Sequence, residues 1–249
     1  MKSKKTKRVK VKKLKLSAFF GIVFCVLLIG FSVFIIYNKP IKHIKIIGTN
    51  LLSDLEIIEI ANIKNYPPIY QISKSGTEKN ISSLALVDNV RIRRKLNGIL
   101  IIEIKENTPL FYNRSANKVI LSNGKQTDIT SKYLGIPTLV NYTQDTVYEK
   151  LIDGLAKIDY TIISLISEIE YFPFKSGDTI IDDTRFLLHM NDGNTVHINI
   201  INISKLNNYR ELFASIEEGA WRIFLDSAAD TVSIRPLNED MRESNETEN

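Results

Sequence analysis

Two histidines and a pair of aspartates are the side chains of this chain best suited to chemistry. Imidazoles accept or donate protons near neutral pH and bind metal ions, and paired carboxylates can act as general acid and base. His189 and His197 lie eight positions apart, a short distance beyond Asp182 and Asp183. Whether they form a site depends on whether the predicted elements bring the two imidazoles together.

The sequence between the histidines predicts a hairpin that separates them. The Asp-Gly dipeptide at 192–193 favours a two-residue turn. That turn would pair His189 with Val196, and it would pair His197 with Leu188. Successive side chains of a strand point to opposite faces of the sheet. We therefore expect the imidazoles on opposite faces and predict no metal site.

The remaining candidates fit structural roles better than chemical ones. His43 follows an apolar run by a few residues, which favours a membrane interface. Glu217 and Glu218 fall at a predicted helix end, where solvated charge is common, and Tyr209 and Trp221 fit core positions. The sequence holds no phosphate-binding glycine loop, no zinc-spaced Cys/His set and no Gly-x-Ser-x-Gly elbow. We predict no catalytic residues, no cofactor and no enzymatic activity.

An uncharged run near the N-terminus predicts a membrane anchor. Residues 16–38 comprise 23 uncharged residues that include Leu16, Cys25 and Tyr37, and 15 of them are Leu, Ile, Val or Phe. About 20 such residues span the roughly 30 Å hydrocarbon core of a bilayer. Residues 1–15 carry nine Lys or Arg and no acidic residue. Because cationic flanks stay cytoplasmic, we expect a basic cytoplasmic tail, a single span and the rest of the chain outside the membrane.

A cleaved signal peptide is the alternative for this run. Its apolar region is normally only about 7–15 residues long and ends at a pair of small residues. Here Phe34 and Ile36 lie near the end of a longer run, without an Ala or Ser pair. A retained anchor is therefore favoured, with the basic tail attracted to anionic lipid.

Charge and cysteine content narrow the function classes. Removing the nine cationic residues of the tail from the chain's 33 leaves 24 against 28 acidic residues, a net charge of −4. The outer part is therefore mildly acidic, with no large basic surface that would predict nucleic-acid binding. Cys25 is the only cysteine, so an intramolecular disulfide is impossible. Some 211 residues follow the span, enough for two domains.

Residues 41–108 predict a β-α-α-β-β unit close to the membrane. Alternation at 44–47 favours a strand. Ser53 and Glu56 have the spacing of a capping box and predict the start of a helix. A second helix is expected from near residue 75.

A hairpin completes this unit. Two apolar-rich segments, 90–96 and 99–105, flank Asn97 and Gly98. Asn-Gly suits a two-residue type I′ turn, because both central residues of that turn need positive φ. We expect an antiparallel pair with that turn.

Residues 109–236 predict a second, mixed domain with a mainly antiparallel sheet. Seven strands are expected, at 110–112, 118–121, 169–172, 185–190, 195–201, 221–225 and 231–235. An extended segment is expected at 135–140, a turn at 123–124, and helices at 146–167 and 204–217. The acidic segment 237–249 is expected to be disordered.

The order and spacing of several short motifs resemble the bacterial division protein family FtsQ, called DivIB in Gram-positive organisms. Residues 44–53, IKIIGTNLLS, resemble the opening of the family's POTRA domain. Residues 87–94, VDNVRIRR, and 101–109, IIEIKENTP, resemble its later strands, and 119–125 and 136–139 resemble motifs of the next domain. Two departures are Asn97-Gly98, where the family usually has a Pro, and Ser122, where Asp is common.

The resemblance implies an α+β fold with a single N-terminal transmembrane helix, a POTRA domain and a "β domain". It also implies a non-enzymatic scaffold at the division septum. Such proteins join FtsB/DivIC-like and FtsL-like partners and help regulate septal peptidoglycan synthesis. The β domain would bind its FtsB-like partner through the edge of its last strands, since an open edge can accept an added strand. The matching residues here are Leu225, Ser227, Val232 and Ile234.

Three alternatives stay open. Val232 and Ile234 could simply be core residues. The chain could be an anchored cell-wall enzyme or sensor with a site that the motifs do not reveal. It could also be a POTRA-bearing export factor, although no run of strands long enough for a membrane barrel follows.

Overall fold

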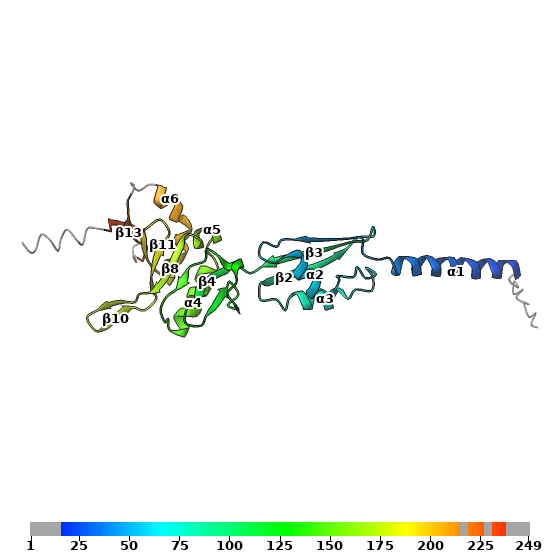
Figure 1. Cartoon of the computed structure of the whole chain (residues 1–249), viewed down its shortest axis with the longest axis horizontal. Coiled ribbons are helices and arrows are strands. Elements are labelled where there is room, and N and C mark those ends of the chain that lie inside the picture. Colours follow the sequence, from blue (N-terminus) through cyan, green and yellow to red (C-terminus); the bar gives the residue numbers. More distant parts are fainter. Residues whose placement is uncertain (1–15, 215–218, 227–230, 238–249) are drawn as a thin grey trace, which may run out of the picture.

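A computed structural model describes residues 16–214, 219–226 and 231–237 of the chain. Figure 1 shows an elongated arrangement in which helix α1, a first α/β domain and a second domain follow one another along the long axis. The predicted basic tail at 1–15 and nearly all of the predicted acidic tail lie outside the described residues.

Helix α1 (Leu16–Tyr37) has the length and composition of a membrane span. Its 22 residues rise about 33 Å at 1.5 Å per residue, close to the hydrocarbon thickness of a bilayer. Cys25 and the large apolar side chains from Phe19 to Tyr37 are exposed in the described chain, as lipid-facing groups are. Within the described ranges, one helix is long and apolar enough to cross a membrane. Helix α1 thus fits the span of a single-pass membrane protein.

The first domain has the expected β-α-α-β-β order. Its elements are β1 (His43–Ile47), α2 (Asp54–Ile60), α3 (Lys74–Ile81), β2 (Val87–Arg94) and β3 (Ile99–Glu106). The sheet order is β1-β3-β2, with β1 parallel and β2 antiparallel to β3. Ile57 and Ile81 of the helices and Leu100 and Ile102 of β3 are fully buried in one core. Their burial joins the helices to the sheet.

The helix starts follow from side-chain capping. Ser53 Oγ accepts a hydrogen bond from the Glu56 N–H at 3.3 Å, so α2 begins where the sequence predicts. The Glu56 carboxylate instead forms an ion pair with Lys132 Nζ at 2.6 Å, in the second domain. Ser73 caps α3 in the same way through the Gly76 N–H.

The β2–β3 turn differs from the prediction. The Lys95 N–H donates to the Ile99 carbonyl at 2.9 Å, and the Gly98 N–H donates to the Lys95 carbonyl at 3.0 Å. The loop therefore has three residues, and only Gly98 among them has a positive φ, of +89°. This is a type I turn followed by a left-handed glycine, so the predicted two-residue type I′ turn is wrong.

The other two glycine turns have the same form. At 122–124, the Gly124 N–H donates to the Leu121 carbonyl at 2.8 Å. At 191–193, the Gly193 N–H donates to the Met190 carbonyl at 3.1 Å. A three-residue loop shifts the register by one relative to a two-residue turn, and the side chains of one strand then change face relative to those of the other.

The second domain is built on a nine-stranded sheet in the order β14-β13-β12-β11-β8-β7-β4-β5-β6. Most neighbouring pairs are antiparallel. The strands are β4 (Pro109–Asn113), β5 (Lys118–Leu121), β6 (Gln126–Thr127), β7 (Thr138–Leu139), β8 (Ile166–Tyr171), β11 (Arg185–Met190), β12 (Thr195–Asn199), β13 (Trp221–Phe224) and β14 (Ser233–Pro236). The predicted extended segment supplies β7, a parallel strand at the middle of the sheet.

The long helix predicted for 146–167 is wrong. Helix α4 (Asp145–Leu155) ends after eleven residues, and the short α5 (Tyr160–Ile163) starts at an N-cap where Asp159 accepts the Thr161 N–H at 2.7 Å. The following residues form β8, which buries Ile166 and Ile169 between β7 and β11. Apolar residues spaced by three or four positions are compatible with a helix or with a strand. Pairing with β7 and β11 stabilises the strand in this segment.

The C-terminal helical region is also split. It comprises the 3₁₀ helix η2 (Ile200–Asn208) and α6 (Tyr209–Ala214), while η1 (Ser131–Tyr133) is a further short 3₁₀ turn. The last residues of the helix predicted at 204–217 fall in a gap of the described chain.

The sequence does not predict the hairpin of β9 (Phe174–Ser176) and β10 (Thr179–Asp182). These strands form a separate two-stranded sheet. The hairpin projects from the second domain in Figure 1. Phe174 and Ile181 are exposed on it, which removes the alternation that reveals a half-buried strand.

The two domains meet at a packed junction. Val119, Leu121 and Tyr133 of the second domain belong to the buried cluster of the first. Lys132 Nζ of the second domain lies 2.6 Å from the Glu56 carboxylate of the first. At the end of β3, the Glu106 carboxylate accepts N–H groups from residues 50–52 within the first domain, at 2.8–3.2 Å. The Thr108 N–H donates to Ser122 Oγ at 3.0 Å. Apolar packing and polar contacts thus both join the domains.

Candidate partner-binding surface

Among the described residues, strand β14 is one edge of the nine-stranded sheet and pairs only with β13. The Leu237 N–H donates to the Ala220 carbonyl at 2.9 Å, which continues the ladder beyond the strand. In an antiparallel ladder, alternate residues direct their N–H and C=O groups toward the neighbouring strand. Residues 233, 235 and 237 therefore face β13 with their backbone groups, whereas Ile234 directs its own away from the sheet.

This outward row is open to another strand. The N–H and C=O of Ile234 face outward, whereas Pro236 offers a carbonyl but has no N–H to donate. Proline is typical of edge strands for that reason. The opposite edge, β6, has only two residues, which is one way in which proteins limit edge pairing. Strand β14 is the better edge for strand addition.

The four predicted partner residues lie in different environments. Val232 is 40% exposed just before β14, and Ile234 is half-buried with its side chain packed on the domain core. Leu225 is fully buried in that core, and its N–H donates to the His197 carbonyl at 2.8 Å. Its assignment as a contact side chain is therefore corrected. Ser227 falls within 227–230, which the structure does not describe.

A buried asparagine fixes the start of β13. Asn194 is 1% exposed and follows the turn between β11 and β12. Its Oδ1 accepts the Trp221 N–H at 2.9 Å, and its Nδ2 donates to the Tyr209 hydroxyl at 3.0 Å. The hydroxyl in turn donates to Asp192 Oδ2 at 2.7 Å. Burial and this carboxylate raise the pKa of Tyr209, which keeps the phenol protonated as a donor.

An ion pair fixes the other end of β13. The Arg185 guanidinium on β11 contacts the Asp226 carboxylate, and both side chains are largely buried. Asn199 Nδ2 donates to Asp182 Oδ2 at 3.3 Å and lies 3.4 Å from the Asp226 carbonyl. Burial alone would raise the pKa of Asp182, but hydrogen bonds from Thr184 and Asn199 lower it. Motif searches do not single out Asn194 or Arg185. The only sequence signal is polar residues inside otherwise apolar strand segments.

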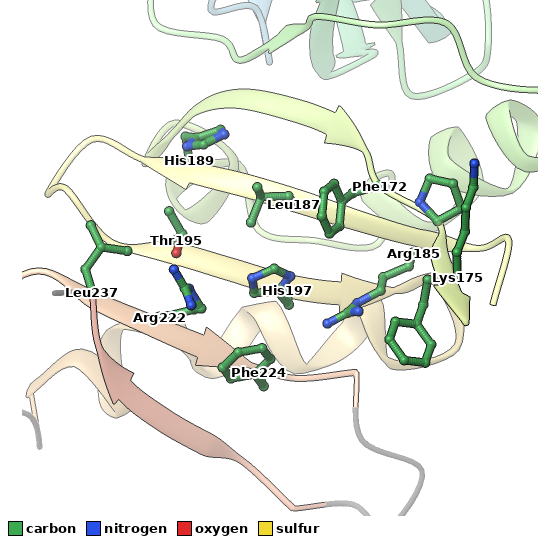
Figure 2. Close-up of a pocket in the computed structure, with 12 residues that line it drawn as sticks. Phe172, Lys175, Arg185, Leu187, His189, Thr195, His197, Arg222, Phe224 and Leu237 are labelled. Atoms are coloured by element: carbon green, nitrogen blue, oxygen red, sulfur yellow. The ribbon is translucent and has the colours of Figure 1, made fainter. Parts of the chain in front are cut away.

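The two faces of the sheet differ near this edge. Phe186, Leu188, Val196 and Ile223 point to the core on one face. The other face is concave, and we call it the groove. It has a volume of about 1020 Å³ and is lined by Phe172, Pro173, Phe174, Lys175, Arg185, Leu187, His189, Thr195, His197, Arg222, Phe224 and Leu237. Figure 2 shows these side chains standing on one side of β11, β12 and β13.

Both histidines belong to this face, contrary to the prediction. The three-residue loop pairs His189 with Thr195 and Leu187 with His197. Residues on facing positions share a face, so His189 and His197 lie on the same side of the sheet. Within the described ranges, no three His, Cys, Asp or Glu residues are grouped so that they could hold a metal ion.

His197 is a neutral aromatic component of the groove floor. It is 9% exposed and stacks on Phe224, with ring centroids 4.7 Å apart and planes 6° apart. Burial, followed by the charges of Arg185, Arg222 and His189, lowers the pKa of His197 to about 4. A neutral, stacked imidazole supports a packing role here.

The comparisons with known proteins agree with the fold. A family model described as "POTRA domain, FtsQ-type" matches residues 39–107. The chain is 26% identical over 196 residues to a cell division protein DivIB from Bacillus cytotoxicus, covering 75% of this chain and 74% of that protein. It is 29% identical over 186 residues to a DivIB from Staphylococcus pseudintermedius, covering 72% of this chain and 61% of that protein.

A solved structure is also similar. It is the major extracytoplasmic domain of DivIB from Geobacillus stearothermophilus, at 22% identity and a TM-score of 0.35, covering 45% of this chain and 99% of that one. The chain thus contains an FtsQ-type POTRA domain and is similar over about three quarters of its length to DivIB cell division proteins.

Proposed function

We propose that this chain is a non-enzymatic scaffold of the division machinery. Its N-terminus is cytoplasmic, both folded domains lie outside the membrane, and the protein gathers at the septum. The open β14 edge carries the proposal, because it offers backbone groups for an added strand rather than a catalytic set. In this role the protein helps to assemble and regulate septal peptidoglycan synthesis.

The partners are FtsB/DivIC-like and FtsL-like division proteins, together with proteins of septal peptidoglycan synthesis. A segment of the FtsB/DivIC-like partner pairs with β14, and backbone hydrogen bonds to Ile234 supply much of the affinity. The exposed side chain of Val232 and the half-buried Ile234 set the register through apolar contacts. Ser227 remains part of the proposed contact segment.

Replacing Val232 by proline tests the edge. Proline removes one outward N–H and fixes φ, while the ladder to β13 uses residues 233 and 235. The full chain in nanodiscs is mixed with the DivIC-like protein of the same organism, and capture is measured by biolayer interferometry. We expect Val232→Pro to abolish capture and Val232→Ala, which keeps the N–H, to weaken it slightly. Full capture by a folded Val232→Pro variant would contradict strand addition at this position.

A cellular experiment tests the scaffold role itself. The protein is depleted in growing cells that carry a fluorescent fusion of the full chain. Filaments without septa, and a fusion that gathers at midcell before depletion, support the proposal. An evenly distributed fusion together with normal septa would favour the alternative of a membrane-anchored cell-wall enzyme or sensor.

A further inference from the structure

The loop between β2 and β3, residues 95–98, is fastened to the chain directly after α1. The Lys42 N–H donates to the Gly98 carbonyl at 2.8 Å, and Lys39 Nζ donates to the Leu96 carbonyl at 3.1 Å. The side chain of Leu96 is 83% exposed. This leucine therefore adds almost nothing to the core of the domain, and its apolar surface is available for contact outside the chain.

A second loop, residues 64–68, is held by the neighbouring residue of the same segment. The Ile41 N–H donates to the Pro67 carbonyl at 3.2 Å. Tyr66 is 49% exposed and has a φ of +49°, which is rare for a bulky residue. Backbone strain of this kind is concentrated at functional sites. Tyrosine is also enriched where proteins meet the headgroup level of a membrane.

The segments that meet here are positively charged. Residues 38–43, 64–72 and 94–98 contain five Lys or Arg and no Asp or Glu. Glu59 lies 3.0 Å from Lys64 and balances its charge, which leaves an excess of four cations in these segments. Cations next to a membrane span are attracted to anionic lipid.

The position of α1 turns both loops toward the bilayer. Tyr37 ends α1, and the residues that hold the loops, 39–42, follow almost immediately. Figure 1 shows α1 leaving one end of the first domain along the long axis of the molecule. With α1 in a membrane, this end of the domain faces the lipid headgroups.

We propose that these two loops dock on the surface of the membrane that α1 spans. Leu96 and Tyr66 enter between the headgroups, and Lys42 and Lys95 bind anionic headgroup phosphates. The docking rests on the proposed single-pass topology and adds a second membrane contact to it. The individual contacts can be weak, because the short segment after α1 holds both loops at the surface at a high local concentration.

A spin label beside Leu96 tests the proposal. It is attached at Asn97→Cys in a Cys25→Ser background of the full chain, with one copy in each nanodisc of phosphatidylglycerol. Collisions with a neutral, water-soluble nickel chelate report the exposure of the label to water. We expect severalfold fewer collisions than for the same label at Asn123→Cys, in an exposed Asn-Gly loop of the second domain. The difference should shrink in nanodiscs of zwitterionic phosphatidylcholine, because anionic headgroups are then missing.

Two substitutions should raise the collisions severalfold. Leu96→Ser removes the apolar side chain, and Lys95→Glu reverses a charge. Ile201→Ser and Lys157→Glu are the matched controls, because Ile201 is also 83% exposed, Lys157 is exposed, and both belong to the second domain. These controls should leave the label protected.

Three results would overturn the docking. The first is a label at Asn97→Cys that collides with the chelate as often as the label at Asn123→Cys. The second is protection that survives both Leu96→Ser and Lys95→Glu. The third is equal protection in the two lipids, which would contradict the binding of anionic headgroups.

The native Cys25 separates these results from a failure of the topology. It lies within α1, so a label on Cys25 of the unsubstituted chain should collide rarely with the chelate. A protected Cys25 together with an exposed label at Asn97→Cys would overturn the docking alone. An exposed Cys25 would contradict the span and the docking together.

Discussion

At the residue scale, Gly48 holds two backbones at a distance that no side chain permits. Its φ is +89°, and a Cβ there would lie 2.1 Å from the carbonyl oxygen of Ile104. The turn after β1 depends on this approach. The sequence indicates a turn at Gly48, but it cannot indicate the close contact, because Ile104 lies on β3, far along the chain.

We therefore predict that Gly48→Ala lowers the free energy of unfolding by roughly 3 kcal/mol or more. The measurement is urea unfolding of the full chain in detergent, followed by circular dichroism. Gly135→Ala is the control, because Gly135 has a similar φ of +82° with open space around its Cβ position. It should cost roughly 1 kcal/mol. Equal losses for the two variants would mean that the backbone contact contributes nothing.

The groove histidine predicts a pH dependence of stability. The pKa of His197 is about 4 in the folded chain, below its ordinary 6.5. Between these pH values the unfolded chain binds more protons than the folded chain. The contribution of neutral His197 to the free energy of unfolding is therefore fully present above pH 6.5 and falls as the pH drops toward 4. We expect a loss of about 2 kcal/mol over that interval.

Thermal unfolding at several pH values measures this loss, and His197→Gln should flatten the profile between pH 6.5 and 4. Asp182, with its pKa below the ordinary 3.8, keeps its contribution throughout this window. An unchanged slope in His197→Gln would show that another group dominates the titration.

At the scale of elements, the joint between the loop after β1 and the end of β3 depends on one carboxylate. Glu106 accepts three backbone N–H groups from residues 50–52. Hydrogen bonds to a charged acceptor are stronger than neutral ones. Glu106→Gln keeps the shape but removes the charge and one acceptor, so we expect a loss of about 1–3 kcal/mol in the free energy of unfolding.

Glu103→Gln is a matched control on the same strand. Glu103 forms an exposed ion pair with Arg93, and such pairs contribute about 0–1 kcal/mol. Chemical unfolding of both variants compares the two positions. A loss in Glu106→Gln no greater than in Glu103→Gln would contradict the proposed anchoring role.

The sequence predicts elements well where local chemistry decides them. Ser53 sets the start of α2, and the alternation before Gly48 sets β1. The prediction fails where pairing with distant strands determines the element. The segment after Leu155 has helical spacing but becomes β8, because strands on both sides bury Ile166 and Ile169.

The candidate site shows the same division. The segment around Val232 and Ile234 is predicted from the family resemblance, and it lies at a sheet edge. The groove is not predicted, because it depends on the register of β11 and β12. One extra loop residue moves His197 to the opposite face. Loop length cannot be deduced from Asp192 and Gly193 alone.

At the scale of the whole molecule, the span joins the POTRA domain with little slack. Tyr37 ends α1 and His43 begins β1. The intervening residues are held by backbone hydrogen bonds, from the Ile41 N–H to Pro67 at 3.2 Å and from the Ile69 N–H to Lys39 at 2.9 Å. The packed junction then fixes the second domain on the first. On the proposed topology, the β14 edge would therefore stand at a set height above the bilayer.

We predict that this height matters when the partner is anchored in the same membrane. Inserting about twelve Gly/Ser residues between Asn38 and Lys39 should reduce capture of a membrane-anchored DivIC-like partner severalfold. Capture of the same partner's soluble domain should be unchanged. Co-reconstituted vesicles and biolayer interferometry supply the two measurements. Equal capture of the anchored partner with and without the insert would contradict the prediction.

On that prediction, the short segment between α1 and β1 would act on association as well as on position. Two proteins confined to one membrane meet in a layer rather than in a volume, and their local concentration is highest when their binding surfaces lie at equal heights. Because the segment between α1 and β1 is short and held by hydrogen bonds, that local concentration would depend on the heights of the two binding surfaces above the bilayer. Selectivity among partners can then arise before any side chain makes contact.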